Sequence, residues 1–203
     1  MNDIQTTILM ARHGQTEWNV SNRFQGNKDS PLTEIGIKQA NDLKASLNGK
    51  NIHIAYSSPL KRALDTAKII TSGTPIRVIE RDGLREINLG PWEGKTRKEA
   101  QLSHPVEFNN FWNQPEQYLL FGAETYEELQ KRVASEIKSI FLDNPGENIL
   151  IVSHWIAIKV VIAYFSGKAL SYLPEIMDIN NGGFLKIVKQ HEIFQLYYGE
   201  SKI

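Results

Sequence analysis

The chain has 203 residues, of which 41% are hydrophobic and 23% charged, a composition typical of a globular protein with a sizeable core. Its 23 Lys and Arg residues balance its 23 Asp and Glu residues, which argues against a dedicated nucleic-acid binder. The absence of cysteine excludes disulfides, thiol catalysis and zinc–thiolate sites. We expect no signal peptide and no membrane span, and therefore a cytoplasmic protein without a membrane or nucleic-acid partner.

Apolar runs and helical patterns alternate along the first half of the chain. Residues 7–11 form a short apolar run typical of a strand, and Thr33 is a plausible N-cap for the helix that follows. Residues 52–58 predict a second strand. Pro59 suits the first position of the next helix, and residues 75–80 predict a third strand.

The second half continues the alternation. A capping box of Thr125 and Glu128 begins a long amphipathic helix over residues 125–141. After it come, in chain order, an apolar strand, an apolar helix and an antiparallel hairpin, over residues 148–153, 155–165 and 182–199. This order predicts an α/β fold, a three-layer α/β/α sandwich with a mostly parallel central sheet and an antiparallel C-terminal hairpin.

Residues 89–123 fit no element cleanly, although they are rich in aromatic residues and proline. A long irregular stretch within a compact domain is commonly functional. We therefore expect residues 1–203 to form a single domain in which residues 89–123 are a lid or cap. Its aromatic side chains have two interpretations, packing and substrate contact, and Trp112 and Tyr118 are candidates for the mouth of a site.

Polar residues fall at or just beyond the expected strand ends, where ligands bind in parallel sheets. Arg12 and His13 follow the first strand, and His154 follows the strand at residues 148–153. Arg62 lies one turn into its helix, and Glu86 lies in the sequence LREINLG. Two guanidinium groups and two imidazoles around one point make an anion site, because arginine matches phosphate oxygens bidentately.

Such a site also contains groups for phosphoryl chemistry. A histidine can act as nucleophile, Glu86 can protonate the leaving oxygen and then activate water, and Asn19 can add a neutral donor. The cations neutralise charge on the phosphoryl group, so we expect no metal and no cofactor. Each residue alone has a structural interpretation: Arg62 as a solvated helix residue, Glu86 as a partner of Arg85, and His154 as a core histidine.

Five segments of the chain carry a resemblance to a known family: RHGQTEWN, DSPLTEIGIKQA, SSPLKRALDTA, LREINLGPWEGKT and IVSH. Together and in this order they resemble the motif set of the histidine phosphatase superfamily, in its phosphoglycerate-mutase-like branch. The resemblance is closest to the small bacterial broad-specificity phosphatases, which are similar to alpha-ribazole phosphatases and metal-independent phosphoserine phosphatases.

The resemblance implies a role for each of the main polar residues. His13 would be the phosphorylated nucleophile, and Arg12 and Arg62 would bind the phosphoryl group. Glu86 would be the proton donor, and His154 would stabilise the transition state.

The resemblance also extends to the loop after the first motif. Asn19 matches a phosphate-contacting position, and Gln25 and Gly26 fall in the family's substrate-contacting loop. One departure is Trp155, which stands where the family usually has glycine after its second histidine. We expect it to disturb the local amide contact with phosphate and to fill part of the cleft.

These observations predict a metal-independent phosphatase that hydrolyses small phosphomonoesters through a phosphohistidine. Two alternatives remain: a phosphoglycerate-mutase-type isomerase and a non-catalytic protein that binds a phospho-ligand. The superfamily's mutases place Arg and Tyr where this chain has Ile87 and Leu89, which offer no donor for a second anionic group. Lys95 and Arg97 supply some positive charge nearby. The sequence specifies neither the physiological substrate nor the oligomeric state.

Overall fold

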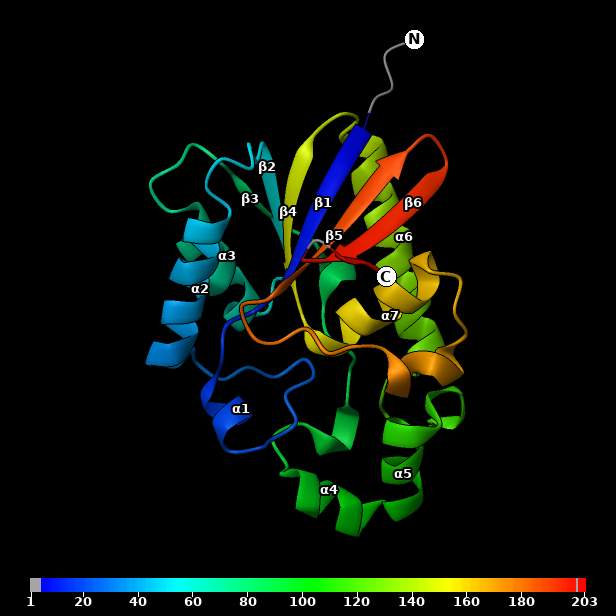
Figure 1. Ribbon diagram of the computed structural model, residues 1–203. Helices are drawn as coiled ribbons and strands as arrows, with labels where there is room; N and C mark the ends of the chain where they lie inside the picture. Colours follow the sequence, from blue (N-terminus) through cyan, green and yellow to red (C-terminus); the bar gives the residue numbers. More distant parts are fainter. Residues whose placement is uncertain (1–4, 200) are drawn as a thin grey trace.

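The structure is a computed structural model that describes residues 5–199 and 201–203. At its centre, these residues form a seven-stranded sheet with the order β3-β2-β4-β1-β5-β6-β7 (Figure 1). The strands are β1 (Gln5–Arg12), β2 (Ile54–Ser57), β3 (Val78–Glu80), β4 (Asn148–Ser153), β5 (Phe184–Gln190), β6 (Ile193–Tyr198) and β7 (Ser201–Lys202). The first four are parallel to one another, and β5 to β7 are antiparallel to their neighbours. The expected sheet is confirmed, with β7 as an addition.

Helices cover both faces of the sheet. On one side lie α2 (Glu34–Ser46) and α3 (Lys61–Thr71), and on the other lie α6 (Tyr126–Asp143) and α7 (Trp155–Phe165) (Figure 1). The three-layer α/β/α architecture is therefore confirmed. The longest of these helices, α6, begins with the expected capping box, in which the Thr125 side chain accepts from the Glu128 amide.

The central strand β1 explains how two hydrophobic cores form. Its side chains alternate between faces, so that Leu9 and Ala11 pack with α2 and α3, while Ile8 and Met10 pack on the α6–α7 side. A strand buried on both faces needs a continuous apolar sequence, which is what β1 and β4 have.

The pairing of β1 with β4 sets the position of the site. The two strands are parallel and in a register that places Arg12 opposite Ser153. The residues that follow them, His13 and His154, therefore leave the sheet side by side. The His13 amide donates to the Ser153 carbonyl at 3.1 Å, which continues the ladder by one step.

Residues 89–123 contain regular elements that the sequence analysis did not assign. They are η2 (Gly90–Trp92), α4 (Arg97–Ser103), α5 (Pro105–Asn113) and η3 (Pro115–Gln117), where η denotes a 3₁₀ helix. Figure 1 shows α4 and α5 beyond the carboxyl ends of the parallel strands. A capping box of Thr96 and Glu99 begins α4, and Pro105 is the first residue of α5.

An aromatic cluster packs beneath this segment. We define it as Phe24, Trp92, Phe111, Tyr118 and Tyr126, all of them buried. The Trp92 ring stacks on Phe24 with centroids 5.3 Å apart and meets Phe111 edge-on at 5.6 Å. The cluster joins the core on the α6–α7 face, so residues 89–123 are anchored by packing.

The remaining elements are short: α1 (Glu17–Val20), η1 (Asp82–Leu84) and η4 (Leu170–Glu175). No helix within the described residues is both long enough and apolar enough to cross a bilayer.

Candidate active site

His13 follows directly on β1 and is 3% exposed. Its Nδ1 lies 2.7 Å from the Gly14 carbonyl oxygen. Because a carbonyl only accepts, Nδ1 carries the proton of the neutral ring, and the lone pair is on Nε2. Burial, followed by the charges of Arg62 and Arg12, holds the pKa of His13 well below its ordinary value. The imidazole is therefore neutral and nucleophilic at neutral pH.

His154 is the N-cap residue of α7 and is fully buried beside His13. The two ring centroids are 5.3 Å apart. Its Nε2 lies 2.8 Å from the Ser58 hydroxyl, and within the described chain its buried Nδ1 has no hydrogen-bond partner. Burial and the neighbouring cations lower the pKa of His154 well below its ordinary value, so its ring is neutral as well.

Arg62 lies in the first turn of α3, and its side chain is 1% exposed. Nη1 contacts Asp29 Oδ1 at 2.7 Å, and Nη2 donates to the Gly26 carbonyl at 2.7 Å. Asp29 also accepts from the backbone amides of Lys61 and Arg62, at 2.7 and 3.3 Å. It thereby caps α3 in place of Leu60, whose side chain makes no cap.

Arg12 is the last residue of β1, and its side chain is held by residues from the second half of the chain. Its Nη1 donates to the Ile179 carbonyl at 3.0 Å, and its guanidinium lies 5.9 Å from the centroid of the Trp155 ring. Burial lowers the pKa of Arg12 to about 10, so the group remains charged at neutral pH. The buried Nε atoms of Arg12 and Arg62 have no partner among the described residues.

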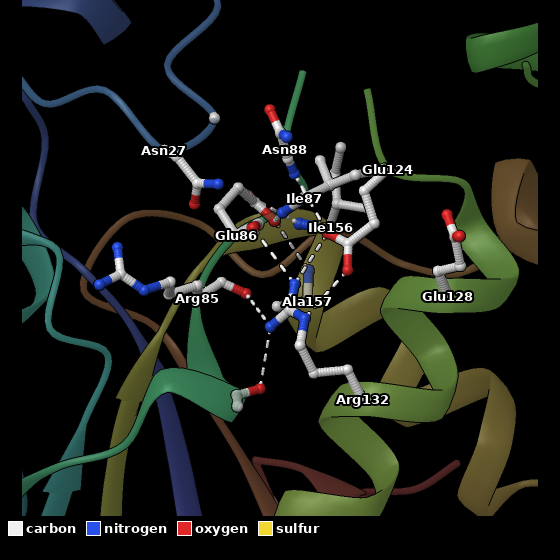
Figure 2. A network of polar contacts seen from close by, with 12 residues as sticks. Asn27, Arg85, Glu86, Ile87, Asn88, Glu124, Glu128, Arg132, Ile156 and Ala157 are labelled. Atoms are coloured by element: carbon white, nitrogen blue, oxygen red, sulfur yellow. Dashed lines mark hydrogen bonds and ion pairs between the residues drawn. The ribbon is translucent and has the colours of Figure 1, made fainter. Parts of the chain in front are cut away.

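Glu86 is the buried carboxyl group of the site, with 8% of the residue exposed. Its carboxylate accepts from the amides of Ile87, Ile156 and Ala157 at 3.0, 3.2 and 3.1 Å, two of which belong to the first turn of α7 (Figure 2). Burial raises the pKa of Glu86, although these amides and Arg62 act in the opposite direction. A raised pKa suits a carboxyl group that must donate a proton near neutral pH.

The loop after α1 supplies Gln25 and Gly26. Gly26 has a φ of 54°, and a Cβ at this position would lie 2.3 Å from Glu93 Oε1. Glycine is therefore required both for the turn and for the close approach of Glu93. The Gly26 carbonyl is the one that accepts from Arg62, so this loop and the Arg62 side chain are tied together.

Asn19 is the last residue of the first motif, RHGQTEWN. Its Oδ1 accepts from the Thr16 amide at 3.0 Å and completes the capping box of α1. Sequence reasoning missed Asn181, whose Nδ2 donates to the His13 carbonyl at 2.9 Å. It also missed the role of Asp29. Both residues act across long sequence separations, so although Asp29 begins the quoted segment DSPLTEIGIKQA, no local pattern predicts these contacts.

Most of the expected site residues line one hollow. Its wall includes Arg12, His13, Asn19, Gln25, Gly26, Arg62 and Glu86. His154, whose ring neighbours that of His13, is not among the lining residues. The hollow has a volume of about 100 Å³ and adjoins a larger one of about 460 Å³, with which it shares Arg97, Trp112 and Trp155. The small hollow suits a phosphoryl group, and the larger one leaves room for the rest of a substrate.

Three aromatic residues singled out by the sequence occupy different places. Trp112 and Trp155 line the hollow, with ring centroids 5.6 Å apart, whereas Tyr118 belongs to the aromatic cluster. Trp155 Nε1 donates to Asp178 at 2.8 Å, which fixes the indole along the wall. The first amides of α7 after Trp155 bond to Glu86.

No group of three His, Cys, Asp or Glu side chains in the described part of the chain is arranged to hold a metal ion.

Comparison with known proteins identifies the family. The model of the histidine phosphatase superfamily (branch 1) matches residues 8–197. The chain belongs to this superfamily. It is 34% identical over 193 residues to a putative phosphoserine phosphatase 2 of Hydrogenobacter thermophilus, covering 94% of this chain and 93% of that protein. The metal-independent phosphoserine phosphatase of Arabidopsis thaliana is 34% identical over 185 residues, covering 87% of this chain and 77% of that protein.

Solved structures agree with this assignment. Bacillus stearothermophilus YhfR matches with a TM-score of 0.94 and 35% identity, over 97% of each chain. Phosphoserine phosphatase from Entamoeba histolytica, solved with 3-phosphoglyceric acid, matches with a TM-score of 0.84 and 30% identity, over 97% of this chain and 96% of that one. The superfamily hydrolyses phosphomonoesters, and the chain is a phosphatase of this kind.

Proposed function

We propose that this phosphatase hydrolyses small phosphomonoesters through a phosphohistidine on His13, with Glu86 as acid and then base. The observation that carries the proposal is the hydrogen bond from His13 Nδ1 to the Gly14 carbonyl, which leaves Nε2 free beside two buried guanidinium groups. Arg12 and Arg62 supply the positive charge that a phosphoryl group requires.

In the first step, His13 Nε2 attacks phosphorus and the ester P–O bond breaks. The electron pair goes to the leaving oxygen, which takes the proton of the Glu86 carboxyl group and departs as an alcohol. Buried donors with no partner in the described chain, Arg12 Nε, Arg62 Nε and His154 Nδ1, are the groups that we assign to the phosphoryl oxygens. Asn19 and the loop at Gln25 and Gly26 bind the substrate around them.

The second step returns the enzyme to its starting state. Water attacks the phosphorus of the phosphohistidine and gives a proton to the Glu86 carboxylate. The P–N bond breaks, its electron pair returns to His13 Nε2, and inorganic phosphate leaves. Both steps use the same carboxyl group in opposite directions, so Glu86 ends protonated, as it began.

We assign the leaving group of the substrate to the larger hollow, and we assign residues 89–123 as the cap over this hollow. This segment contributes Arg97 and Trp112 to the wall. The Arg97 guanidinium lies 4.9 Å from the Trp112 ring centroid, and no carboxylate of the described residues forms an ion pair with it. Phosphoserine is the first substrate to test, because relatives over most of the chain are named for it.

A labelling experiment tests the covalent intermediate. Brief incubation with a substrate carrying radioactive phosphate, without added metal, should leave an acid-labile and base-stable label on the protein. His13→Ala should abolish both label and turnover, because the nucleophile is gone. His53→Ala is the matched control, since His53 directly precedes β2 at its amino end and its half-exposed side chain contacts Glu147. Label that persists in His13→Ala would exclude His13 as the nucleophile.

A second assay separates the phosphatase from the mutase alternative. Ile87 and Leu89 are buried and apolar, so the Glu86 loop offers no second anion clamp to retain an intermediate. We expect 3-phosphoglycerate primed with the bisphosphate to yield little 2-phosphoglycerate, while nitrophenyl phosphate is hydrolysed readily. Isomerisation faster than phosphate release would overturn the phosphatase mechanism.

A further inference from the structure

The Glu86 loop has almost no regular structure of its own. Residues 85–89, between η1 and η2, belong to no helix or strand. A buried loop must find partners for its backbone carbonyls elsewhere, or pay in stability for leaving them unpaired. Because Glu86 must meet the leaving oxygen within hydrogen-bond reach, whatever holds this loop also controls the acid.

Arg132, on α6, supplies those partners from behind the loop. Nη1 donates to the carbonyls of Gly83 and Arg85, both at 3.1 Å, and Nη2 approaches the Glu86 carbonyl at 3.4 Å (Figure 2). One planar guanidinium therefore contacts three carbonyls of the segment that carries the acid. Lysine has a single ammonium group and cannot reproduce this fork.

Glu124 fixes the guanidinium in turn. Its carboxylate contacts Arg132 Nε at 2.9 Å and Nη2 at 2.8 Å, a bidentate pair. The same carboxylate accepts from the Asn88 amide at 3.1 Å, and the Glu124 amide donates to the Asn88 carbonyl at 2.8 Å. The two ends of the loop are thus joined to one ion pair, whose side chains are 29% and 15% exposed.

We infer that Arg132, oriented by Glu124, is the positioning residue for the general acid Glu86. Arg132 contacts the backbone of the acid loop and not the carboxylate, whose own partners are the amides of Ile87, Ile156 and Ala157. The ion pair determines where Glu86 stands, and the amides determine which way its carboxylate points. This inference rests on the proposed role of Glu86 as the acid.

A leaving-group comparison tests the inference. The ratio of kcat/KM for an alkyl phosphate to that for nitrophenyl phosphate reports acid catalysis, because nitrophenolate leaves without help. It reports only the first step, since the phosphohistidine is common to both substrates. Arg132→Met should lower the ratio about tenfold, because a displaced acid loses alignment. Arg132→Lys should recover little of the ratio.

Arg81→Met is the matched control. Arg81 also pairs with carboxylates of α6, Glu136 and Asp143, but it donates to no carbonyl of the acid loop. We expect its ratio to match the wild type. If Arg132→Met does not fold, Glu124→Gln tests the same pair, because its amide can still accept from Asn88 but loses the bidentate charge.

The outcomes distinguish the inference from the proposed function. A low ratio in Glu86→Gln together with a wild-type ratio in folded Arg132 and Glu124 variants overturns the positioning role alone. An equal loss on both substrates, with a lower melting temperature, shows that the pair only stabilises the fold. A wild-type ratio in Glu86→Gln would show that Glu86 is not the general acid, whatever the ratios of the Arg132 variants.

Discussion

The hollow at the proposed active site lies next to the aromatic cluster, since Phe24 and Phe111 of the cluster also line it, but the two regions are built differently. In the cluster, each ring is packed against others, and the Trp92 indole donates to His104 at 3.2 Å. At the hollow, buried nitrogens of Arg12, Arg62 and His154 have no partner in the described chain, and burial lowers the pKa of all three side chains. The cluster favours stability, whereas the hollow sacrifices stability for function.

The largest effect that we expect is the loss of acid catalysis. Glu86→Gln keeps the size of the side chain but removes the proton, so kcat/KM for an alkyl phosphate should fall about 10²–10⁴-fold and for nitrophenyl phosphate far less. The raised pKa of Glu86 also predicts how the ratio of kcat/KM for the alkyl ester to that for the nitrophenyl ester changes with pH. Because the first step needs the protonated form, the alkyl-to-nitrophenyl ratio in the wild type should fall as pH rises through that pKa.

The pH dependence includes its own control. The two substrate phosphates ionise at different pH, because the nitrophenyl ester is the stronger acid, and Glu86→Gln measures what this contributes to the ratio. The fall with pH that we assign to Glu86 should be absent from this variant. A fall as steep as in the wild type would assign the proton to another group.

The second prediction compares stability in the two regions. Trp92→Ala should lower the free energy of unfolding by about 3–5 kcal/mol, because it leaves a cavity in the middle of the aromatic cluster. Arg12→Met should change the free energy of unfolding by about 1 kcal/mol or less, since the lost bond to Ile179 is offset by removing a buried charge. Urea denaturation measures both values.

Phosphatase activity should distinguish the two variants in the opposite sense to stability, with the larger loss in Arg12→Met. Arg12→Met should lose most phosphatase activity while it remains folded. A large loss of stability in Arg12→Met would mean that the hollow is built like the cluster, and the contrast between the two regions would not hold.

The sequence predicted the sheet and the helices around it for identifiable reasons. Strands β1 and β4 are apolar without interruption because both faces are covered, and α6 has a capping box and a clear apolar stripe. The segment at residues 89–123 shows no clear helical pattern in the sequence, although Thr96, Glu99 and Pro105 mark its helix starts. Its short helices have too few turns to show periodicity.

The site could be predicted only as far as its residues follow strands or motifs. His13 and His154 are brought together by the parallel register of β1 and β4, which can be predicted once both residues are seen to follow neighbouring strands. Asp29, Asn181 and Arg132 contact residues of the proposed site from distant positions in the sequence. Asp29 begins the quoted segment DSPLTEIGIKQA, but no repeat, spacing or composition reveals its contacts or those of the other two residues, so only the folded chain identifies them.

The smallest effect concerns the boundary between the two regions. Trp112 contacts Phe24 of the cluster and Trp155 of the hollow, with centroids 6.2 and 5.6 Å away. Trp112→Ala should shift preference away from aromatic leaving groups by a few-fold, about 1 kcal/mol or less of contact energy. Tyr118→Phe is the control, because its buried hydroxyl has no partner within the described residues. Unchanged preference with a large loss of stability would assign Trp112 to packing.

The distribution of tryptophan gives the protein a built-in optical signal. Of its four tryptophans, Trp18, Trp112 and Trp155 line the hollow, and Trp92 is fully buried in the cluster. Emission from the first three should change when a ligand occupies the hollow, whereas emission from Trp92 should change only when the core is lost. A titration with phosphate or vanadate and a denaturation curve can therefore both be followed by tryptophan fluorescence on the same unlabelled sample.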